Sequence, residues 1–193
     1  MTDPLPILAG IAFRMGAPVN DLMARIRAHL SAEGVSIGGV CQESIWDEAS
    51  GQKTLVVREI NDAWELPILE YRGKEARGCR LDPQAITDLS HRLDTLFETK
   101  PDLMMINRFG RAESESRGLR DVFERAAMEH VPLLVAVRED YCDAWRAFHG
   151  GMGLELPMDE AAVYDWWHGL EIQRSTVGEP NADIPADKPQ TVA

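Results

Sequence analysis

Apolar runs of strand length alternate along this chain with segments whose apolar residues recur every three or four positions. Residues 7–13 (ILAGIAF) form the first run, and their length and composition predict a buried strand. Residues 19–33 follow, with isoleucine and leucine residues four positions apart on one helical face. Gly34 stands where a helix ends with a positive φ. The chain therefore begins with a strand and a helix that packs over it.

The same alternation continues to residue 173. It predicts further strands over residues 35–42, 54–60, 64–69, 103–107 and 132–137, and further helices over residues 82–98, 118–129, 140–148 and 159–173. Asn61 and Asp62 join two of these strands into a hairpin, which we expect to be inserted beside the main sheet. Strands that alternate with helices of this length indicate a three-layer α/β fold, with a mostly parallel sheet between two layers of helices.

The length of 193 residues suits one domain and is short for two. Residues 1–174 hold all the predicted elements, and within them residues 150–157 (GGMGLELP) form a glycine-rich link between the last two helices. Residues 175–193 contain prolines and almost no large apolar residues, which predicts a disordered tail. We therefore expect one α/β domain followed by a tail.

The charge balance limits the classes of partner. The chain has 20 basic and 32 acidic residues, and the net charge of −12 opposes non-specific binding to nucleic acid or anionic lipid. No apolar run approaches the roughly 18 residues that cross a bilayer. The opening segment, MTDPLPILAG, carries an acid where a signal peptide needs basic residues. We expect a cytoplasmic protein without membrane insertion or a nucleic-acid partner.

Cysteine and histidine spacing supplies no metal or redox motif. Cys41, Cys79 and Cys142 lie far apart without a CxxC pair, and we expect reduced thiols. The histidines lack HxxxH or HxH spacing, so no metal site is predicted. Cys41 ends a predicted strand and is expected in the core. Cys79 would become reactive, or bind a soft metal, if neighbouring arginines lowered its pKa, although a packed, unreactive thiol is the simpler interpretation.

The segment LMMINRFGRAE carries a motif. It resembles the second nucleotide-site motif of small P-loop nucleoside-triphosphatases called cancer-related, in which an apolar strand leads into Asp-Glu, then Gly-Lys, then an acid. Gly110, Arg111 and Glu113 keep this frame. Asn107 and Arg108 replace the Asp-Glu pair. The resemblance implies a P-loop-like fold in which an amide replaces the magnesium-holding carboxylate.

The first nucleotide-site motif is also missing. A P-loop requires GxxxxGK[ST], because the glycines let backbone N–H groups wrap the phosphates, the lysine contacts them and the hydroxyl holds Mg²⁺. Residues 13–20 at the equivalent place read FRMGAPVN, with one glycine, a proline and no Lys-Ser/Thr pair. We therefore expect no magnesium-nucleotide cofactor.

Four sequence segments resemble a bacterial domain family of unknown function that is often encoded beside molybdenum ABC-transporter genes, and this resemblance is closer than the one to the nucleoside-triphosphatases. They are GGVCQ (38–42), ARGCRLD (76–82), NRFG (107–110) and AAVYDWW (161–167). The chain is similar to that family, in unbroken order, over residues 7–168. The resemblance implies molybdate or tungstate as ligand and a molybdenum transporter or molybdoenzyme as protein partner. It supplies no catalytic residue.

Basic residues gather where the predicted strands end. Residues 72–80 carry four basic residues and one glutamate, a net of +3, and residues 105–120 carry four arginines and two glutamates, a net of +2. Ligands bind outside the carboxyl ends of parallel strands, and arginine presents planar paired donors to oxyanions. We therefore expect an anion site at this edge. Its candidate residues are Arg14, Arg77, Cys79, Arg80, Asn107, Arg108 and Arg111.

These residues favour a non-catalytic binding or accessory protein that holds a small oxyanion or a phosphate-bearing ligand. Two alternatives stay open: a diverged nucleotide phosphohydrolase or transferase with Glu113 as the general base, and a protein–protein adaptor that docks on a transporter or molybdoenzyme. The arginines also suit an exposed surface, and Glu113 suits the start of a helix. Trp166 and Trp167 predict a last helix packed over the sheet, and such residues also suit a homo-oligomer interface.

Overall fold

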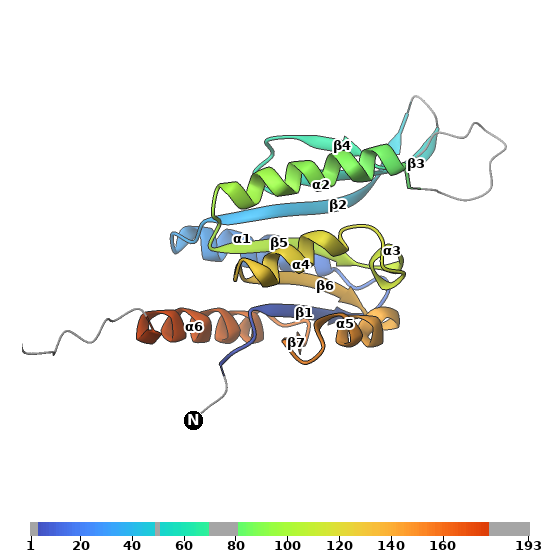
Figure 1. The fold of residues 1–193 in the computed structure, drawn as a ribbon. Helices are drawn as coiled ribbons and strands as arrows, with labels where there is room; N and C mark the ends of the chain where they lie inside the picture. Colours follow the sequence, from blue (N-terminus) through green and yellow to red (C-terminus); the bar gives the residue numbers. More distant parts are fainter. Residues whose placement is uncertain (1–3, 49–50, 70–80, 178–193) are drawn as a thin grey trace, which may run out of the picture.

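The described residues form one seven-stranded sheet with helices on both faces (Figure 1). The computed structural model describes residues 4–48, 51–69 and 81–177. The strands are β1 (Leu8–Phe13), β2 (Ile37–Asp47), β3 (Gln52–Glu59), β4 (Glu65–Pro67), β5 (Leu103–Phe109), β6 (Leu133–Arg138) and β7 (Gly153–Leu156). The helices are α1 (Val19–Ala32), α2 (Pro83–Glu98), α3 (Arg111–Ser114), α4 (Arg120–Met128), the short 3-10 helix η1 (Glu139–Tyr141), α5 (Cys142–His149) and α6 (Glu160–Val177).

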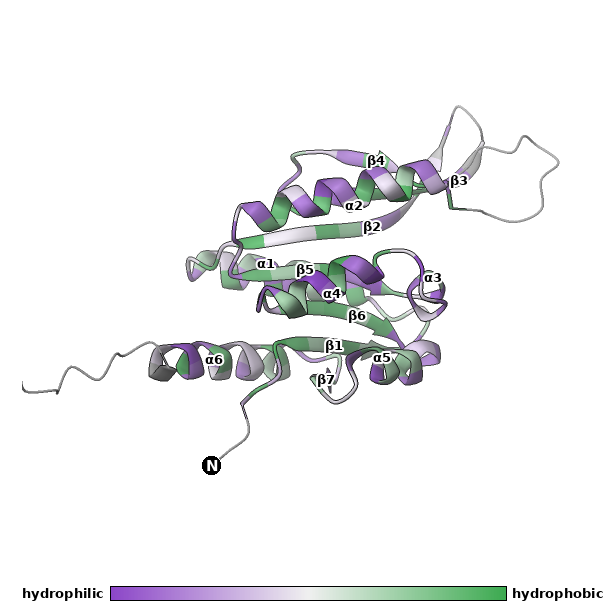
Figure 2. Ribbon diagram, viewed as in Figure 1, coloured by the Kyte–Doolittle hydropathy of each residue, from purple (hydrophilic) through white to green (hydrophobic). Residues whose placement is uncertain are grey.

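Five neighbouring strands run parallel, in the order β2-β5-β6-β1-β7. Helices α2, α4 and α5 pack on one face through one hydrophobic cluster, and α1 and α6 pack on the other face through a second. Strands β1 and β6 are apolar along nearly their whole length because both of their faces are covered (Figure 2). The predicted three-layer α/β fold with a mostly parallel sheet is confirmed.

Strands β2, β3 and β4 form an antiparallel meander at one edge of the sheet. The turn between β3 and β4 lies where the sequence predicted it, with Asp62 at a φ of 60°. The buried carboxylate of Glu59 closes this turn by accepting hydrogen bonds from the backbone N–H groups of Asn61 (2.7 Å) and Ala63 (3.2 Å). The predicted hairpin is confirmed, and because β3 pairs directly with β2 it extends the edge of the main sheet.

The glycine-rich segment at residues 150–157 is more than a link. It holds β7, which pairs in parallel with β1 at the other edge of the sheet and places Gly153 opposite Leu8. The sequence did not predict this strand, because four residues that begin with glycine are too few to show an alternating pattern. Helix α3 is also only four residues long, and the sequence did not predict it because a single helical turn is too short to show a helical period.

Helix α6 closes the face that carries α1. Trp166 and Trp167 are 4% and 1% exposed, which confirms their predicted packing in the core. The indole N–H of Trp166 donates to the carbonyl oxygen of Pro6 at 2.8 Å. The helix continues to Val177, so residues 175–177, predicted as the start of a tail, are helical, and the rest of that segment lies outside the described residues. No helix within the described ranges has the length and apolar character needed to cross a bilayer.

Candidate functional site

The loop between β1 and α1 lies at the carboxyl edge of the parallel strands. It turns through a hydrogen bond from the Ala17 N–H to the Arg14 carbonyl oxygen (3.0 Å), with Gly16 at a φ of 85°. Pro18 directly precedes the first turn of α1, and no side chain caps that end of the helix. The loop is thus a tight turn that leads straight into the helix.

A cavity of about 270 Å³ opens beside this loop, and we call it the loop cavity. Its lining residues are Phe13, Met15, Gly16, Ala17, Pro18, Val19, Asn20, Arg108 and Arg138. Arg108 belongs to β5 and Arg138 ends β6, so two adjacent strands bring two guanidinium groups to the start of α1. Cations and the unpaired N–H groups of a first helical turn both attract anions.

The two arginines of the loop cavity differ in their partners. Arg138 forms an ion pair with Asp140, with 2.8 Å between Nε and Oδ2, and donates from Nη2 to the Tyr141 hydroxyl at 3.1 Å. Arg108 is exposed and forms no ion pair within the described part of the chain. Arg138 is therefore held in position by protein groups, whereas Arg108 has a guanidinium group that is available to a ligand.

Asn107, a predicted ligand residue, is 2% exposed and joins two strands. Its Oδ1 accepts from the Gln42 N–H at 2.6 Å. Its Nδ2 donates to the Gln42 carbonyl oxygen and to Oδ1 of Asn20, both at 2.9 Å. The two bonds to Gln42 continue the contact between β2 and β5 beyond the last backbone pair, Val40 and Ile106. The polar atoms of Asn107 are therefore engaged within the protein.

Glu113, the candidate general base, is also engaged by the backbone. One carboxylate oxygen accepts from the Gly110 N–H at 2.9 Å, and the other accepts from the Leu119 N–H at 3.1 Å. The side chain is 8% exposed, and Gly118 packs against it so closely that a Cβ at that position would overlap Oε1. This geometry matches the interpretation of Glu113 as a helix-start acid, because it joins the starts of α3 and α4.

We expect Glu113→Gln to lower the free energy of unfolding by about 1–2 kcal/mol, because an amide keeps one acceptor oxygen and turns a donor toward the second N–H. Urea unfolding measures the change. The control is Glu124→Gln, which removes only an exposed ion pair with Arg120 on α4 and should cost about 0.3–0.5 kcal/mol. Equal losses in the two variants would contradict the assigned role.

Three predicted ligand residues, Arg77, Cys79 and Arg80, lie outside the described residues. The structure adds Arg138, which the sequence-based set of candidates left out. Its position at the end of a predicted strand was the available signal, because the same rule selected Asn107 and its neighbour.

The remaining two predicted ligand residues are paired with carboxylates. Arg14 forms an ion pair with Glu139 (3.1 Å) and is not one of the residues that line the loop cavity. Arg111 forms an ion pair with Glu115 (2.7 Å) at the start of α3. The structure therefore brings only Arg108, of the predicted arginines it describes, into the loop cavity.

Cys41 lines a separate cavity of about 150 Å³ beneath α1. It is half-buried, and Nδ2 of Asn107 lies 3.1 Å from its Sγ. Burial, and then the nearby charge of Glu43, raise the pKa of the thiol, which keeps it protonated at neutral pH. Across residues 4–48, 51–69 and 81–177, no three His, Cys, Asp or Glu side chains gather in a group that could hold a metal ion.

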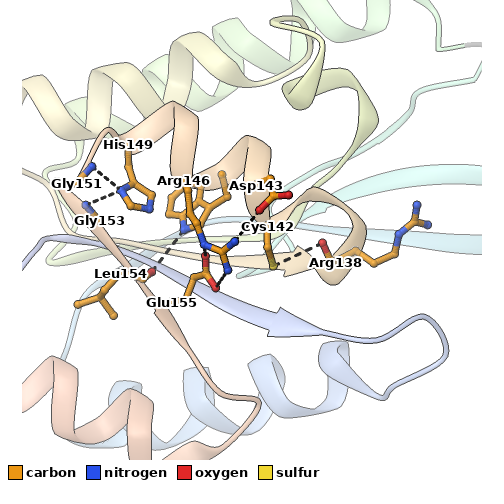
Figure 3. Close-up of polar contacts among 10 residues, drawn as sticks. Arg138, Cys142, Asp143, Arg146, His149, Gly151, Gly153, Leu154 and Glu155 are labelled. Carbon is orange, nitrogen blue, oxygen red and sulfur yellow. Dashed lines mark hydrogen bonds and ion pairs between the residues drawn. The ribbon is translucent and has the colours of Figure 1, made fainter.

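His149 is a buried histidine that joins the end of α5 to β7 (Figure 3). Its Nδ1 accepts hydrogen bonds from the backbone N–H groups of Gly151 (3.2 Å) and Gly153 (3.1 Å). Burial lowers the pKa of His149, and among the neighbouring charges Glu155 raises it whereas Arg146 lowers it. The histidine is therefore neutral in the folded protein at pH 7.

His149 should make the domain less stable in mild acid. Its pKa in the folded state lies below the unfolded value of about 6.5, so its stabilising contribution is complete above that pH and falls as the pH drops through the lowered folded value. Urea unfolding between pH 8 and 5 should show a steeper loss for the wild type than for His149→Gln. His91→Gln, at an exposed position on α2, should follow the wild type. Parallel pH profiles for wild type and His149→Gln would refute this role.

Comparison with known proteins relates this geometry to a family. A family model described as "Protein of unknown function (DUF2478)" matches residues 8–166. The chain belongs to the DUF2478 family. The match runs from β1 into α6, so the DUF2478 region includes the loop cavity and all seven strands. The resemblance to a bacterial domain family of unknown function is confirmed.

Two further proteins are similar to this DUF2478 chain. The "Molybdenum import ATP-binding protein ModC 2" of Bradyrhizobium diazoefficiens is 31% identical over 179 residues, which cover 93% of this chain and 20% of that protein. The chain thus spans about a fifth of the length of this relative. The solution structure of a human cancer-related nucleoside triphosphatase matches with a TM-score of 0.58 and 13% identity, over 88% of this chain and 96% of that chain. The likeness to P-loop nucleoside-triphosphatases in fold is confirmed.

Proposed function

We propose that this DUF2478 protein is a non-catalytic binding or accessory protein that holds a small oxyanion or a phosphate-bearing ligand in the loop cavity. The observation that carries the proposal is the presence of Arg108 and Arg138 together at the start of α1, in a chain whose net charge is −12. Arg138 is already paired with Asp140, so Arg108, among the described residues, supplies the uncompensated charge that a bound anion would neutralise.

The cavity complements an oxyanion in hydrogen bonding as well as in charge. Arginine supplies paired, planar N–H donors, and the first-turn N–H groups of the 14-residue helix α1 add donors and a favourable dipole. A tetrahedral oxyanion accepts from several such donors at once. Molybdate, tungstate, sulfate and phosphate share this shape and negative charge, so all four are suitable first probes.

The residues around the cavity favour binding without hydrolysis. Mg²⁺ in nucleotide sites is commonly held by one or two carboxylates together with the substrate phosphates, and none of the described residues that line the loop cavity carries a carboxylate. The nearby Asn107 and Glu113 already bond to backbone groups. We therefore propose that the ligand leaves chemically unchanged.

A role in molybdenum metabolism rests on the relative that carries molybdenum import in its name. The aligned region is about a fifth of that protein, so four fifths of its length lie outside the match. We propose that ATP binding in that relative belongs to the unmatched part and that the shared region is an accessory module. For this chain, molybdate or tungstate would be the ligand, and a transport protein or molybdoenzyme the protein partner.

Isothermal titration calorimetry with molybdate, tungstate, sulfate and phosphate tests the binding site. We expect Arg108→Ala and Arg138→Ala each to weaken anion binding at least tenfold, or about 1.4 kcal/mol, because a charge-assisted hydrogen bond is lost. Arg174→Ala is the control, since it removes the same charge near the end of α6 away from the carboxyl edge (Figure 1). Affinity that is unchanged in both loop-cavity variants would remove this site.

The catalytic alternative is tested on the same protein. A sensitive phosphate-release assay with several nucleotides and Mg²⁺ should give no turnover above background. Turnover that Glu113→Gln abolishes would overturn the non-catalytic proposal and support a diverged phosphohydrolase.

A further inference from the structure

A third cavity, of about 210 Å³, adjoins Arg108, and we call it the aliphatic cavity. It lies on the face of the sheet covered by α2 and α4, with lining side chains that include Val40, Leu55, Val57, Ile68, Ile86 and Ile106. Arg108 lines the loop cavity as well. A ligand held by Arg108 therefore lies at the mouth of an apolar chamber.

The polar groups at the edge of the aliphatic cavity are, apart from Arg108, largely occupied. Arg111 is paired with Glu115. Asn107 and Glu113 satisfy backbone groups of neighbouring segments. The cavity thus combines an aliphatic interior with a cation that has no ion-pair partner among the described residues. Small-molecule sites commonly have this composition, with an apolar wall and a few polar groups that set orientation.

The volume of the aliphatic cavity limits the size of the ligand group that it can hold. An apolar cavity of roughly 150 Å³ lined by aliphatic and aromatic side chains stays dry and accepts a benzene ring. The aliphatic cavity is larger, at about 210 Å³, and so has room for one six-membered ring with short substituents. A ribose would place hydroxyl groups against aliphatic side chains without hydrogen-bond partners, which disfavours a nucleoside in this cavity.

From this geometry we infer that the ligand of this site is an organic anion, a phosphate monoester with a compact apolar ring, whose phosphate contacts Arg108 and whose ring occupies the aliphatic cavity. The inference rests on the proposed function, since it uses the same arginine. Of the two ligand classes proposed there, a small inorganic oxyanion and a phosphate-bearing ligand, it selects the second and adds an apolar ring. Burial of the ring adds binding free energy that an inorganic oxyanion lacks.

Calorimetry with inorganic phosphate, methyl phosphate and phenyl phosphate tests the inference on the full chain. We expect phenyl phosphate to bind at least tenfold more tightly than the other two. Ile86→Trp, at a half-buried position of α2 that lines the aliphatic cavity, should remove this difference and leave inorganic phosphate affinity within twofold of wild type. Ile172→Trp, which adds the same side chain at an exposed position of α6, should behave as wild type.

The outcomes separate this inference from the proposed function. If inorganic phosphate binds and phenyl phosphate binds no more tightly, the inference fails and the anion site stands. If none of the three probes binds, the inference fails, and the proposed function fails with it when molybdate, tungstate and sulfate do not bind either. A preference for phenyl phosphate that persists in folded Ile86→Trp also overturns the inference. Should that variant not fold, Leu55→Phe fills the same cavity from β3 and is held to the same criterion.

Discussion

Gly39→Ala should cost about 4 kcal/mol or more of the free energy of unfolding, a large part of the stability of an ordinary domain. Gly39 pairs with Met105 across β2 and β5 and adopts a φ of 134°, a conformation that L side chains rarely take. A Cβ there would overlap the carbonyl oxygen of Met105 and lie 2.8 Å from its carbonyl carbon. Strand β5 cannot move away, because Met105 is also paired with Leu134 of β6.

Thermal and urea unfolding measure this effect, and the melting temperature should fall by roughly 10 °C. Gly51→Ala is the matched control, because Gly51 also has a positive φ, 64°, but a Cβ added to it would meet no atom within 4 Å. It should cost only about 1 kcal/mol, for backbone strain alone. Similar losses at the two glycines would show that the close approach of β2 and β5 is not as described.

Asn107→Asp, which restores the carboxylate of the nucleoside-triphosphatase motif, should destabilise the domain by about 3 kcal/mol at pH 7. The Gln42 N–H would still find an acceptor. The Gln42 carbonyl oxygen and Oδ1 of Asn20 would instead face a carboxylate oxygen in place of the Nδ2 donor, 2.9 Å away in the wild type. A buried charge that meets two acceptors has lost its compensation, so the penalty exceeds that of one missing hydrogen bond.

The matched control for this substitution is Asn20→Asp. It makes the same chemical change at the other end of one hydrogen bond, but there the oxygen already acts as the acceptor. Asn20 also lies in the first turn of α1, where a negative charge is favoured by the helix dipole. We expect a change below about 1 kcal/mol in urea unfolding. If Asn107→Asp left the free energy of unfolding unchanged, the amide of Asn107 would not join β2 to β5.

These two substitutions explain why parts of the GGVCQ and NRFG segments are needed for the fold. In GGVCQ, Gly39 allows the close approach of β5, and Gln42 supplies the backbone groups that Asn107 of NRFG bonds. Arg108, the next residue of that phrase, is exposed and unpaired within the described ranges. In the NRFG motif, Asn107 therefore joins two strands, whereas its neighbour Arg108 presents an exposed cation.

The sequence predicted where the candidate site lies, but it could not predict which residues line it. Ligands of parallel α/β sheets bind at the carboxyl ends of strands, and this rule selected Arg108 correctly as a residue of that edge. It could not exclude Arg14, because the ion pair with Glu139 joins residues 125 positions apart. It also could not show that both oxygens of Glu113 bind backbone N–H groups. Such contacts depend on which segments fold together.

The sequence by itself determined the layered α/β architecture, because strand runs and helical faces are local patterns. It also determined the start of α2, where Oδ1 of Asp82 accepts from the Gln84 N–H at 2.8 Å. Only the tertiary structure decided that β7 completes the sheet, that Arg108 and Arg138 share one cavity, and that the amide of Asn107 is engaged. The physical reason is that hydrogen-bond partners and cavity walls come from segments distant in sequence, whereas periodicity reports only on neighbours.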